Sequence, residues 1–224
     1  MDMVLKKRGK STDPETLVPG VRSADRSIAG AVVVSVDYHL APEHKFSASW
    51  DDALAAYKWT LTNAASINGD SKKLALAGEG AGGNLAVATA IEVRDAGLQA
   101  PPHVLAVYPV SQTSTTTESY EKCTIAKPLN RPMIKWFVDK LINSPSDLKD
   151  PRIQLIDAKL KDLPSVIIIN ASIDPLLSDG VLSDGVMLED ALKKAGVPVE
   201  RKMYSGVTHE FFGMAAVVQK AKEA

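Results

Sequence analysis

A dense glycine turn between an apolar strand and an alanine-rich helix constrains the fold of this chain more than any other feature. Residues 74–90 read Leu-Ala-Leu-Ala-Gly-Glu-Gly-Ala-Gly-Gly-Asn-Leu-Ala-Val-Ala-Thr-Ala. This layout is typical of a nucleophile elbow, Gly-x-Ser-x-Gly, in which a sharp turn holds a serine hydroxyl above the end of a sheet. Here the central residue of the five is Gly80, which has no side chain. The sequence therefore predicts an elbow without its attacking atom.

The same turn also fits a second pattern, the dinucleotide fingerprint Gly-x-Gly-x-x-Gly, over residues 78–83. That fingerprint expects an acidic residue about 20 positions downstream, at the end of the next strand, where it binds a ribose hydroxyl. The next predicted strand, 103–108, is followed by Pro-Val-Ser-Gln and no carboxylate. The elbow is therefore the favoured interpretation, and dinucleotide binding is the weaker alternative.

Bulk properties exclude several classes of protein. A length of 224 residues suits a single domain over 1–224, and 26 basic against 27 acidic residues give no electrostatic footprint for nucleic acid or an anionic membrane. No apolar stretch approaches the ~20 residues that span a bilayer. The only cysteine, Cys123, cannot form an internal disulfide, and the N-terminus lacks the apolar core of a secretory signal. We therefore expect a cytoplasmic protein. With no Cys/His cluster of ligand spacing, we expect neither a metal nor a cofactor.

Strands and helices alternate along most of the chain. Residues 31–37 form a β-branched run, as expected for a strand covered on both faces. Further strands are expected at 73–78, 103–108, 165–170 and 199–204, and helices at 49–66, 83–96 and 185–195. The alternation predicts an α/β fold with a mostly parallel, doubly wound sheet.

Three segments interrupt this alternation. Residues 1–30 are polar and show no sustained period, which predicts an irregular N-terminal arm. Residues 111–163 begin with a Ser/Thr-rich loop and read as a small helical, lid-like insertion over the strand ends. The tetrapeptide Ser-Asp-Gly-Val occurs at 178–181 and again at 183–186, a local duplication expected to lengthen a loop or the start of a helix.

Two polar motifs follow successive parallel strands. Asp174-Pro175-Leu176 comes after strand 165–170, and Thr208-His209-Glu210 comes after strand 199–204. A carboxylate and an imidazole at these strand ends can meet above the sheet, where the Asp fixes the imidazole tautomer and the His accepts a proton from a nucleophile. Taken alone, Asp174 could equally be a helix N-cap, and His209 an ordinary loop histidine. Their order after the elbow, nucleophile then Asp then His, favours a catalytic triad.

Together these motifs resemble the bacterial hormone-sensitive-lipase-like family of α/β-hydrolases, which are carboxylesterases and lipases. The stretches that carry the resemblance are Asp37-Tyr38-His39-Leu40-Ala41-Pro42-Glu43, the elbow from Gly78 to Ala86, Tyr108-Pro109, Asp174-Pro175-Leu176, Gly196-Val197-Pro198-Val199 and His209-Glu210-Phe211-Phe212-Gly213. The resemblance runs from about residue 31 to the end and implies an α/β-hydrolase fold acting on a small-molecule ester. It also implies Asp174 as the orienting acid, His209 as the general base, Gly80 at the nucleophile position and the Ala81 N–H as an oxyanion donor.

The chain departs from that family in two respects. Gly80 replaces the serine, and no His-Gly-Gly-Gly loop is present to supply the other oxyanion donors. Residues 22–28 resemble the segment before the family's first strand and Ala31 begins what resembles its fourth, so the strands between are expected to be missing. Strand 31–37 would then have an exposed edge, open to pairing in a homodimer.

These departures bear directly on activity. Loss of a triad nucleophile costs on the order of 10⁶ in kcat, so hydrolysis is expected to be lost or strongly impaired. The alternative is a non-catalytic, ligand-binding pseudo-hydrolase that keeps its pocket for recognition. In the insertion, Trp136 and Phe137 could line an acyl pocket, although packing in the core of the lid helix is the favoured role.

Overall fold

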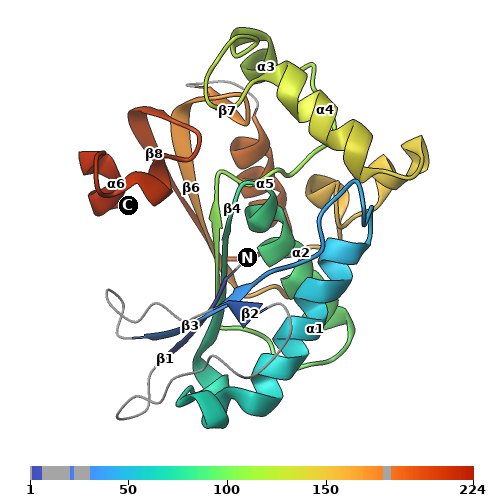
Figure 1. Cartoon of the computed structure of the whole chain (residues 1–224), viewed down its shortest axis with the longest axis vertical. Coiled ribbons are helices and arrows are strands. Elements are labelled where there is room, and N and C mark those ends of the chain that lie inside the picture. The colour runs from blue at the N-terminus through green and yellow to red at the C-terminus, as the bar shows by residue number, and fades with distance from the viewer. Residues whose placement is uncertain (1, 7–20, 23–30, 179–182) are drawn as a thin grey trace.

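Eight strands form one sheet at the centre of the computed structural model, which describes residues 2–6, 21–22, 31–178 and 183–224 (Figure 1). The strands are β1 (Asp2–Lys6), β2 (Val21–Arg22), β3 (Ala31–Val36), β4 (Leu74–Glu79), β5 (His103–Val107), β6 (Ser165–Asp174), β7 (Leu177–Ser178) and β8 (Val199–Thr208). Their order is β2-β3-β1-β4-β5-β6-β7, and β8 pairs with β6. The pairs β4–β5, β5–β6 and β6–β8 are parallel, as the alternation of strands and helices predicts.

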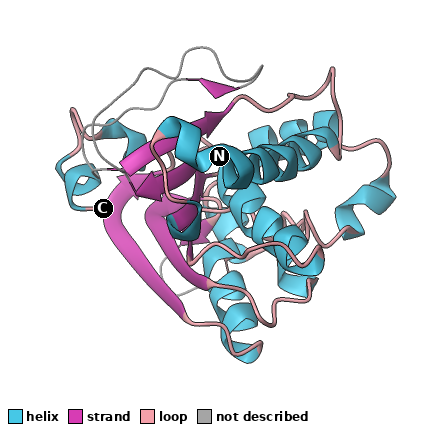
Figure 2. Cartoon of the chain, turned by 90° about the horizontal axis from the view of Figure 1, so that it is seen from below, coloured by secondary structure: helices cyan, strands magenta, loops and turns pink. Residues whose placement is uncertain are grey.

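The helices lie mainly on one side of this sheet (Figure 2). The helices are α1 (Ala48–Asn63), α2 (Ala81–Asp95), α3 (Glu118–Lys122), α4 (Arg131–Leu141), α5 (Asp184–Lys194) and α6 (Gln219–Glu223). Short 3₁₀ helices are η1 (Ala64–Ile67), η2 (Ser71–Lys73), η3 (Pro145–Lys149), η4 (Leu155–Asp157) and η5 (Phe211–Met214). Helices α1 and α2 cover one face, and α6 lies on the other (Figure 1). The predicted helices and parallel strands are confirmed to within a few residues, apart from longer C-terminal ends on β6 and β8.

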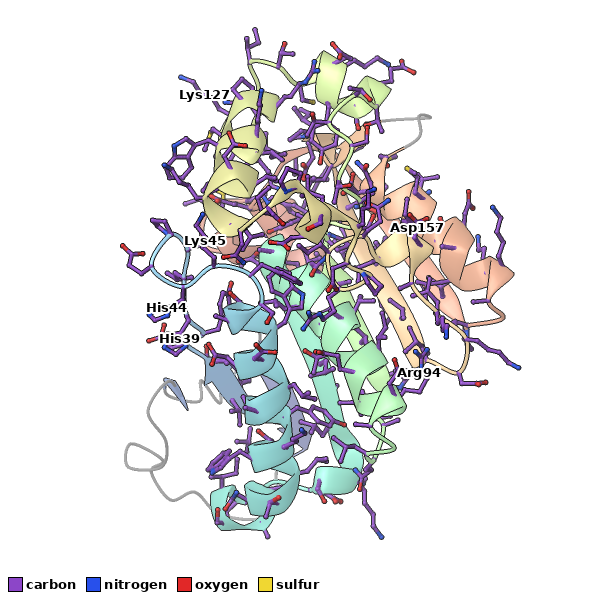
Figure 3. The ribbon with its side chains drawn as sticks, turned by 90° about the vertical axis from the view of Figure 1, so that its right-hand side faces the viewer. His39, His44, Lys45, Arg94, Lys127 and Asp157 are labelled. Atoms are coloured by element: carbon purple, nitrogen blue, oxygen red, sulfur yellow. The ribbon has the colours of Figure 1, made fainter. Side chains whose placement is uncertain are left out.

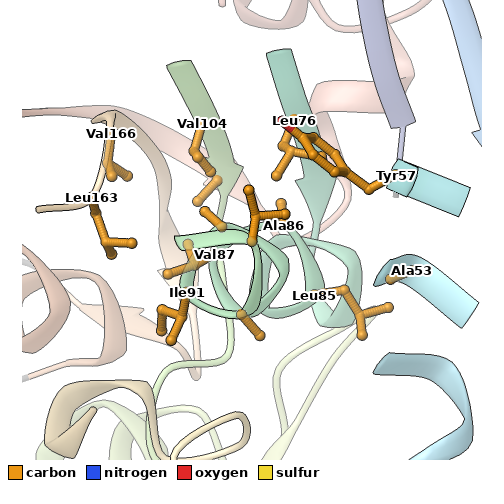
Figure 4. Packing of buried hydrophobic residues seen from close by; sticks show 14 of the residues in the cluster. Ala53, Tyr57, Leu76, Leu85, Ala86, Val87, Ile91, Val104, Leu163 and Val166 are labelled. Carbon is orange, nitrogen blue, oxygen red and sulfur yellow. The ribbon is translucent and has the colours of Figure 1, made fainter. Parts of the chain in front are cut away.

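The main core lies between α2 and the parallel strands. Leu76, Val104 and Val166 point from β4, β5 and β6 toward Ala86, Val87 and Ile91 of α2, with Ala53 and Tyr57 of α1 alongside (Figure 4). Most of α2 is buried, which explains its alanine-rich composition: small side chains let the helix approach both the sheet and α1. This packing fixes the N-terminus of α2 at the carboxyl edge of the sheet.

The N-terminal arm differs from its expected form in two places. Residues 2–6 form β1, which runs antiparallel between β3 and β4, and residues 21–22 form β2, which pairs with the other side of β3. The expectation of an irregular arm is therefore wrong for these seven residues. One edge of β3 is paired with β1 over Ala31–Ser35, and the other is paired with β2 at Ser35 and Val36, so the expected exposed edge of strand 31–37 is partly covered. The homodimer that was expected to pair through this edge stays a prediction. The remainder of the arm, including most of the segment 22–28, lies outside the described residues.

Residues 111–163 contain helices and loops and no strand, and every residue of this interval is described. Lys45 Nζ donates to Ile142 O at 3.0 Å, and Arg94 Nη1 donates to Lys161 O at 2.7 Å, so the insertion is held by two cations from the body of the fold (Figure 3). Its own small core joins Tyr120 and Ile134 to Leu176, which closely follows β6. The insertion therefore packs against the carboxyl edge of the sheet.

The two aromatic residues of α4 do not pack in a core, so the favoured role from the sequence is wrong. Trp136 is 56% exposed and Phe137 50% exposed, and the two rings contact each other edge-on with centroids 5.3 Å apart. Ile134 is the buried residue of α4. The sequence pattern misleads because α4 contacts the rest of the protein along a narrow stripe, which leaves the neighbouring positions open.

The second copy of the duplicated tetrapeptide lies at the start of a helix, which was one of the two expected outcomes; the other was a longer loop. Ser183 lies at the N-cap position of α5, and Asp184 is the first residue of that helix. Most of the first copy, from residue 179 onward, lies outside the described residues.

Candidate active site

The glycine turn forms a sharp strand-to-helix junction. β4 ends at Glu79, α2 begins at Ala81, and Gly80 between them has φ +55° and ψ −118°. A positive φ favours glycine, because a side chain in this region is strained. The Gly80 N–H donates to Val107 O at 3.0 Å, which ties the turn to the adjacent strand β5. The backbone thus has the shape of a nucleophile elbow even though no side chain projects from its apex.

Two neighbouring glycines are required by close backbone approach. A Cβ added to Gly78 would lie 2.1 Å from Gly82 O, and one added to Gly83 would lie 3.1 Å from two atoms of Pro109. These contacts bring the first turn of α2 against β4 and the residues after β5. Helix and strand packing therefore accounts for the glycines around Gly80 without any phosphate ligand.

Asp174 and His209 form a buried hydrogen-bonded pair. Asp174 is the last residue of β6, and His209 directly follows β8, which lies parallel to β6. Asp174 Oδ2 is 2.6 Å from His209 Nδ1; the carboxylate is fully buried and the histidine is 8% exposed. Asp174 Oδ1 accepts from the Leu176 N–H at 2.9 Å in a tight turn, and the chain continues into β7. Asp174 is therefore not a helix N-cap.

His209 also faces the elbow. A Cβ added to Gly80 would lie 3.3 Å from His209 Nε2 and 3.8 Å from its Cε1. The Tyr108 ring packs beside the imidazole, with ring centroids 4.3 Å apart. With Nδ1 held by Asp174, Nε2 is the nitrogen that can accept a proton on the side of Gly80. The structure thus brings together Gly80, Asp174 and His209, in the spatial relation that a triad requires.

The predicted oxyanion donor also lies at this junction. Ala81 is exposed and is the first residue of the 15-residue helix α2. The first N–H groups of a helix have no acceptor within the helix, and its dipole favours negative charge at that end. β1, the strand beside β4, runs antiparallel to it and ends at Lys6, which pairs with Ala31 at the start of β3. Antiparallel β1 thus occupies the position in the sheet between β3 and β4.

Comparison with known proteins identifies the family. The sequence pattern of the family described as an alpha/beta hydrolase fold matches residues 23–213. The chain belongs to the α/β-hydrolase family.

Relatives of this α/β-hydrolase are esterases. Carboxylesterase NlhH of Mycobacterium tuberculosis is 36% identical over 202 residues, which cover 88% of this chain and 61% of that protein. Ethyl acetate hydrolase of Pseudomonas putida is 31% identical over 197 residues, 87% of this chain and 60% of that protein. The solved hyperthermophilic esterase of Pyrobaculum calidifontis superposes with a TM-score of 0.80 at 36% identity, covering 86% of this chain and 63% of that one. The family expected from the motifs is confirmed, and this chain spans about three fifths of the length of these relatives.

Two residues near the site of this α/β-hydrolase have contacts that the sequence patterns did not identify. Glu79 accepts at Oε2 a hydrogen bond of 2.6 Å from Tyr108 Oη, and Tyr108, in the loop after β5, has φ +33°. Burial and the Glu79 carboxylate raise the pKa of Tyr108. This pair links the residue before Gly80 to the ring that supports His209. The Tyr108-Pro109 motif after β5 was the available signal for it.

Asp184 is the second unrecognised residue. It is fully buried at the start of α5, where Oδ2 accepts from the Ser111 N–H and Oδ1 from Gln112 Nε2, each at 2.9 Å. The carboxylate therefore joins α5 to the first residues of the insertion. Burial raises the pKa of Asp184 to about 7, although the donors on Gln112 and Ser111 act in the opposite direction. The repeated Ser-Asp-Gly-Val was the signal that marked this position.

We expect Asp184 to make the hydrolase less stable as pH rises from about 4 to about 7. In this interval the folded protein keeps the Asp184 proton while the unfolded chain has lost it, so stability is greatest below the unfolded pKa and falls through the folded pKa. A difference of this size corresponds to at most about 4 kcal/mol. Urea unfolding of Asp184→Asn across this pH range should show a flatter profile. Asp190→Asn, at an exposed position of the same helix, is the control and should keep the native slope.

Two further features concern the described part of the chain. None of its helices combines the length and apolar character needed to cross a membrane. Within the same residues, no group of three or more His, Cys, Asp or Glu side chains is arranged to hold a metal ion.

Proposed function

We propose that this α/β-hydrolase domain binds small carboxylic esters at the elbow and that Gly80 leaves its hydrolytic activity lost or strongly impaired. One observation carries the proposal: His209 Nε2 faces Gly80, 3.3 Å from the position of an added Cβ, while Nδ1 is held by Asp174 at 2.6 Å. The relatives named as carboxylesterase and ethyl acetate hydrolase support the ester as the substrate class.

Each group has a role in this proposal. Asp174 fixes the imidazole tautomer, His209 acts as general base, and the Ala81 N–H donates to the developing oxyanion. With a serine at the apex, the hydroxyl oxygen would attack the ester carbonyl as its proton passed to Nε2. Gly80 removes that step, and a water activated by His209 is left as a slow attacking group.

The second candidate function is ligand recognition without turnover. It is favoured by Gly80 itself, because glycine relieves about 1–3 kcal/mol of backbone strain at a positive φ while the elbow keeps its shape. Both functions predict ester binding at the same place. They differ in whether a restored nucleophile produces activity.

Thermal unfolding with phenyl acetate tests ester binding. At tenfold excess over its dissociation constant, a ligand of the folded state stabilises by about 1.4 kcal/mol, which corresponds to a rise of about 3–6 °C in Tm for a chain of this size. Ala81→Trp, at the exposed start of α2, should abolish the rise, whereas Ala65→Trp, exposed in η1, should keep it. A flat response of the native chain would contradict the proposal. Titration with NADH, followed by its fluorescence, should show no saturable change; saturation would favour the dinucleotide alternative.

A further inference from the structure

We propose that this chain transfers the acyl group of an ester to a small primary alcohol, which enters beside Gly80 and is activated by His209. The inference rests on the proposed function, because it requires the ester to bind at the elbow. It concerns the acceptor of the acyl group, which a serine would otherwise supply.

The space beside Gly80 is the first support. Among the described residues other than Gly80 and its chain neighbours Glu79 and Ala81, only His209 has atoms, Nε2 and Cε1, within 4 Å of a Cβ built on Gly80. A seryl side chain contributes one carbon and one hydroxyl oxygen, and methanol consists of the same two heavy atoms. An untethered alcohol must stand further from the backbone than a bonded side chain, so its carbon lies toward the open side while its oxygen approaches Nε2. Methanol is the smallest alcohol that supplies these two atoms.

The base is the second support. Nδ1 of His209 is 2.6 Å from the fully buried Asp174 carboxylate, and the imidazole is 8% exposed and flanked by the Tyr108 ring. The ring is therefore held by Asp174 and by Tyr108 independently of any group at Gly80. Gly80 has φ +55° although it carries no side chain, so the backbone keeps the shape of the elbow. An alcohol that reaches Nε2 of His209 therefore does so beside this turn.

The reaction balances with His209 as the only proton carrier. Nε2 removes the hydroxyl proton of the alcohol as its oxygen bonds to the ester carbonyl carbon, and the Ala81 N–H donates to the carbonyl oxygen. The bond from the carbonyl carbon to the original alkoxyl oxygen then breaks, and that oxygen receives the proton from His209. The products are a new ester and the released alcohol. Nothing is oxidised or reduced, and water entering the same space gives the carboxylic acid instead.

The test measures both products formed from p-nitrophenyl acetate by the native chain in 0–1 M methanol. We expect nitrophenol release above the no-enzyme reaction to rise at least fivefold, with methyl acetate, measured by gas chromatography, accounting for the increase. The rate stays far below that of a bonded nucleophile, because a free molecule forgoes an effective molarity of about 10⁵ M or more. tert-Butyl alcohol at the same concentration controls for solvent and should produce no rise.

Two variants locate the effect. Gly80→Ala places a methyl carbon 3.3 Å from Nε2 and should abolish methyl acetate formation. His209→Gln keeps a polar side chain and should abolish it as well, which covers the case that Gly80→Ala does not fold. Native enzyme that forms no methyl acetate above background overturns the inference, as does formation that survives His209→Gln. If Gly80→Ser hydrolyses the ester while the native chain makes no methyl acetate, only this inference fails. If a folded Gly80→Ser is inactive as well, both fail.

Discussion

Gly80→Ser should raise hydrolysis of p-nitrophenyl acetate about 10³-fold over the native chain. A triad nucleophile is worth on the order of 10⁶ in kcat, and the lack of a second oxyanion donor is expected to remove about 10²–10³ of that gain. The new side chain would start 3.3 Å from His209 Nε2, so its hydroxyl oxygen falls within hydrogen-bond reach of the base. Initial rates of nitrophenol release, with a burst equal to the enzyme concentration, are the measurement.

The gain should depend on the other two members of the site. Adding His209→Gln to Gly80→Ser should return the rate to that of the native chain, and adding Asp174→Asn should remove most of the gain through the wrong imidazole tautomer. Gly80→Ser itself should lower the free energy of unfolding by about 1–3 kcal/mol, because serine at φ +55° is strained. A correctly folded variant without any gain would show that the site lacks a working oxyanion hole, and would leave ligand recognition as the better function.

The site was predictable from sequence because local rules determine it. A glycine-rich turn between strand and helix has one favourable geometry, and residues that follow neighbouring parallel strands meet at one edge of the sheet. Gly80, Asp174 and His209 each lie at such a position, so their order along the chain was enough to bring them together. The parallel pairs β4–β5, β5–β6 and β6–β8 bring the elbow, Asp174 and His209 to the same edge of the sheet.

The remaining features depend on pairings between distant segments. β1 lies within a polar arm that has no strand period, and its pairing with β3 and β4 buries a backbone edge that composition does not reveal. Trp136 and Phe137 carry the apolar character of a core helix, yet only tertiary contact decides which stripe of α4 is covered. In the sequence, Asp184 is a polar residue of a short repeat, which is typical of the surface. It is buried because Ser111 and Gln112, distant in the sequence, donate hydrogen bonds to its carboxylate.

Gly78→Ala should destabilise the protein by about 3 kcal/mol or more. The added Cβ would lie 2.1 Å from the carbonyl oxygen and 2.3 Å from the carbonyl carbon of Gly82, and both are backbone atoms that cannot turn away as a side chain can. To remove this clash, the first turn of α2 would have to move away from β4. Most of α2 is buried, so its packing opposes that movement. Overpacking of this kind typically costs 1–3 kcal/mol, and a clash with backbone lies at or above the upper end.

Gly213→Ala is the matched control for this prediction. Apart from its chain neighbours, a Cβ at Gly213 meets no described atom within 4 Å, so the change should stay within about 0.5 kcal/mol. In thermal unfolding the two variants should then differ by about 6–12 °C in Tm. Added to Gly80→Ser, Gly78→Ala should also reduce ester hydrolysis, since shifting α2 moves both the attacking oxygen and the Ala81 N–H relative to His209. Equal stability of the two alanine variants would mean that strand and helix do not approach this closely, and the elbow geometry on which the ester site depends would have to be abandoned.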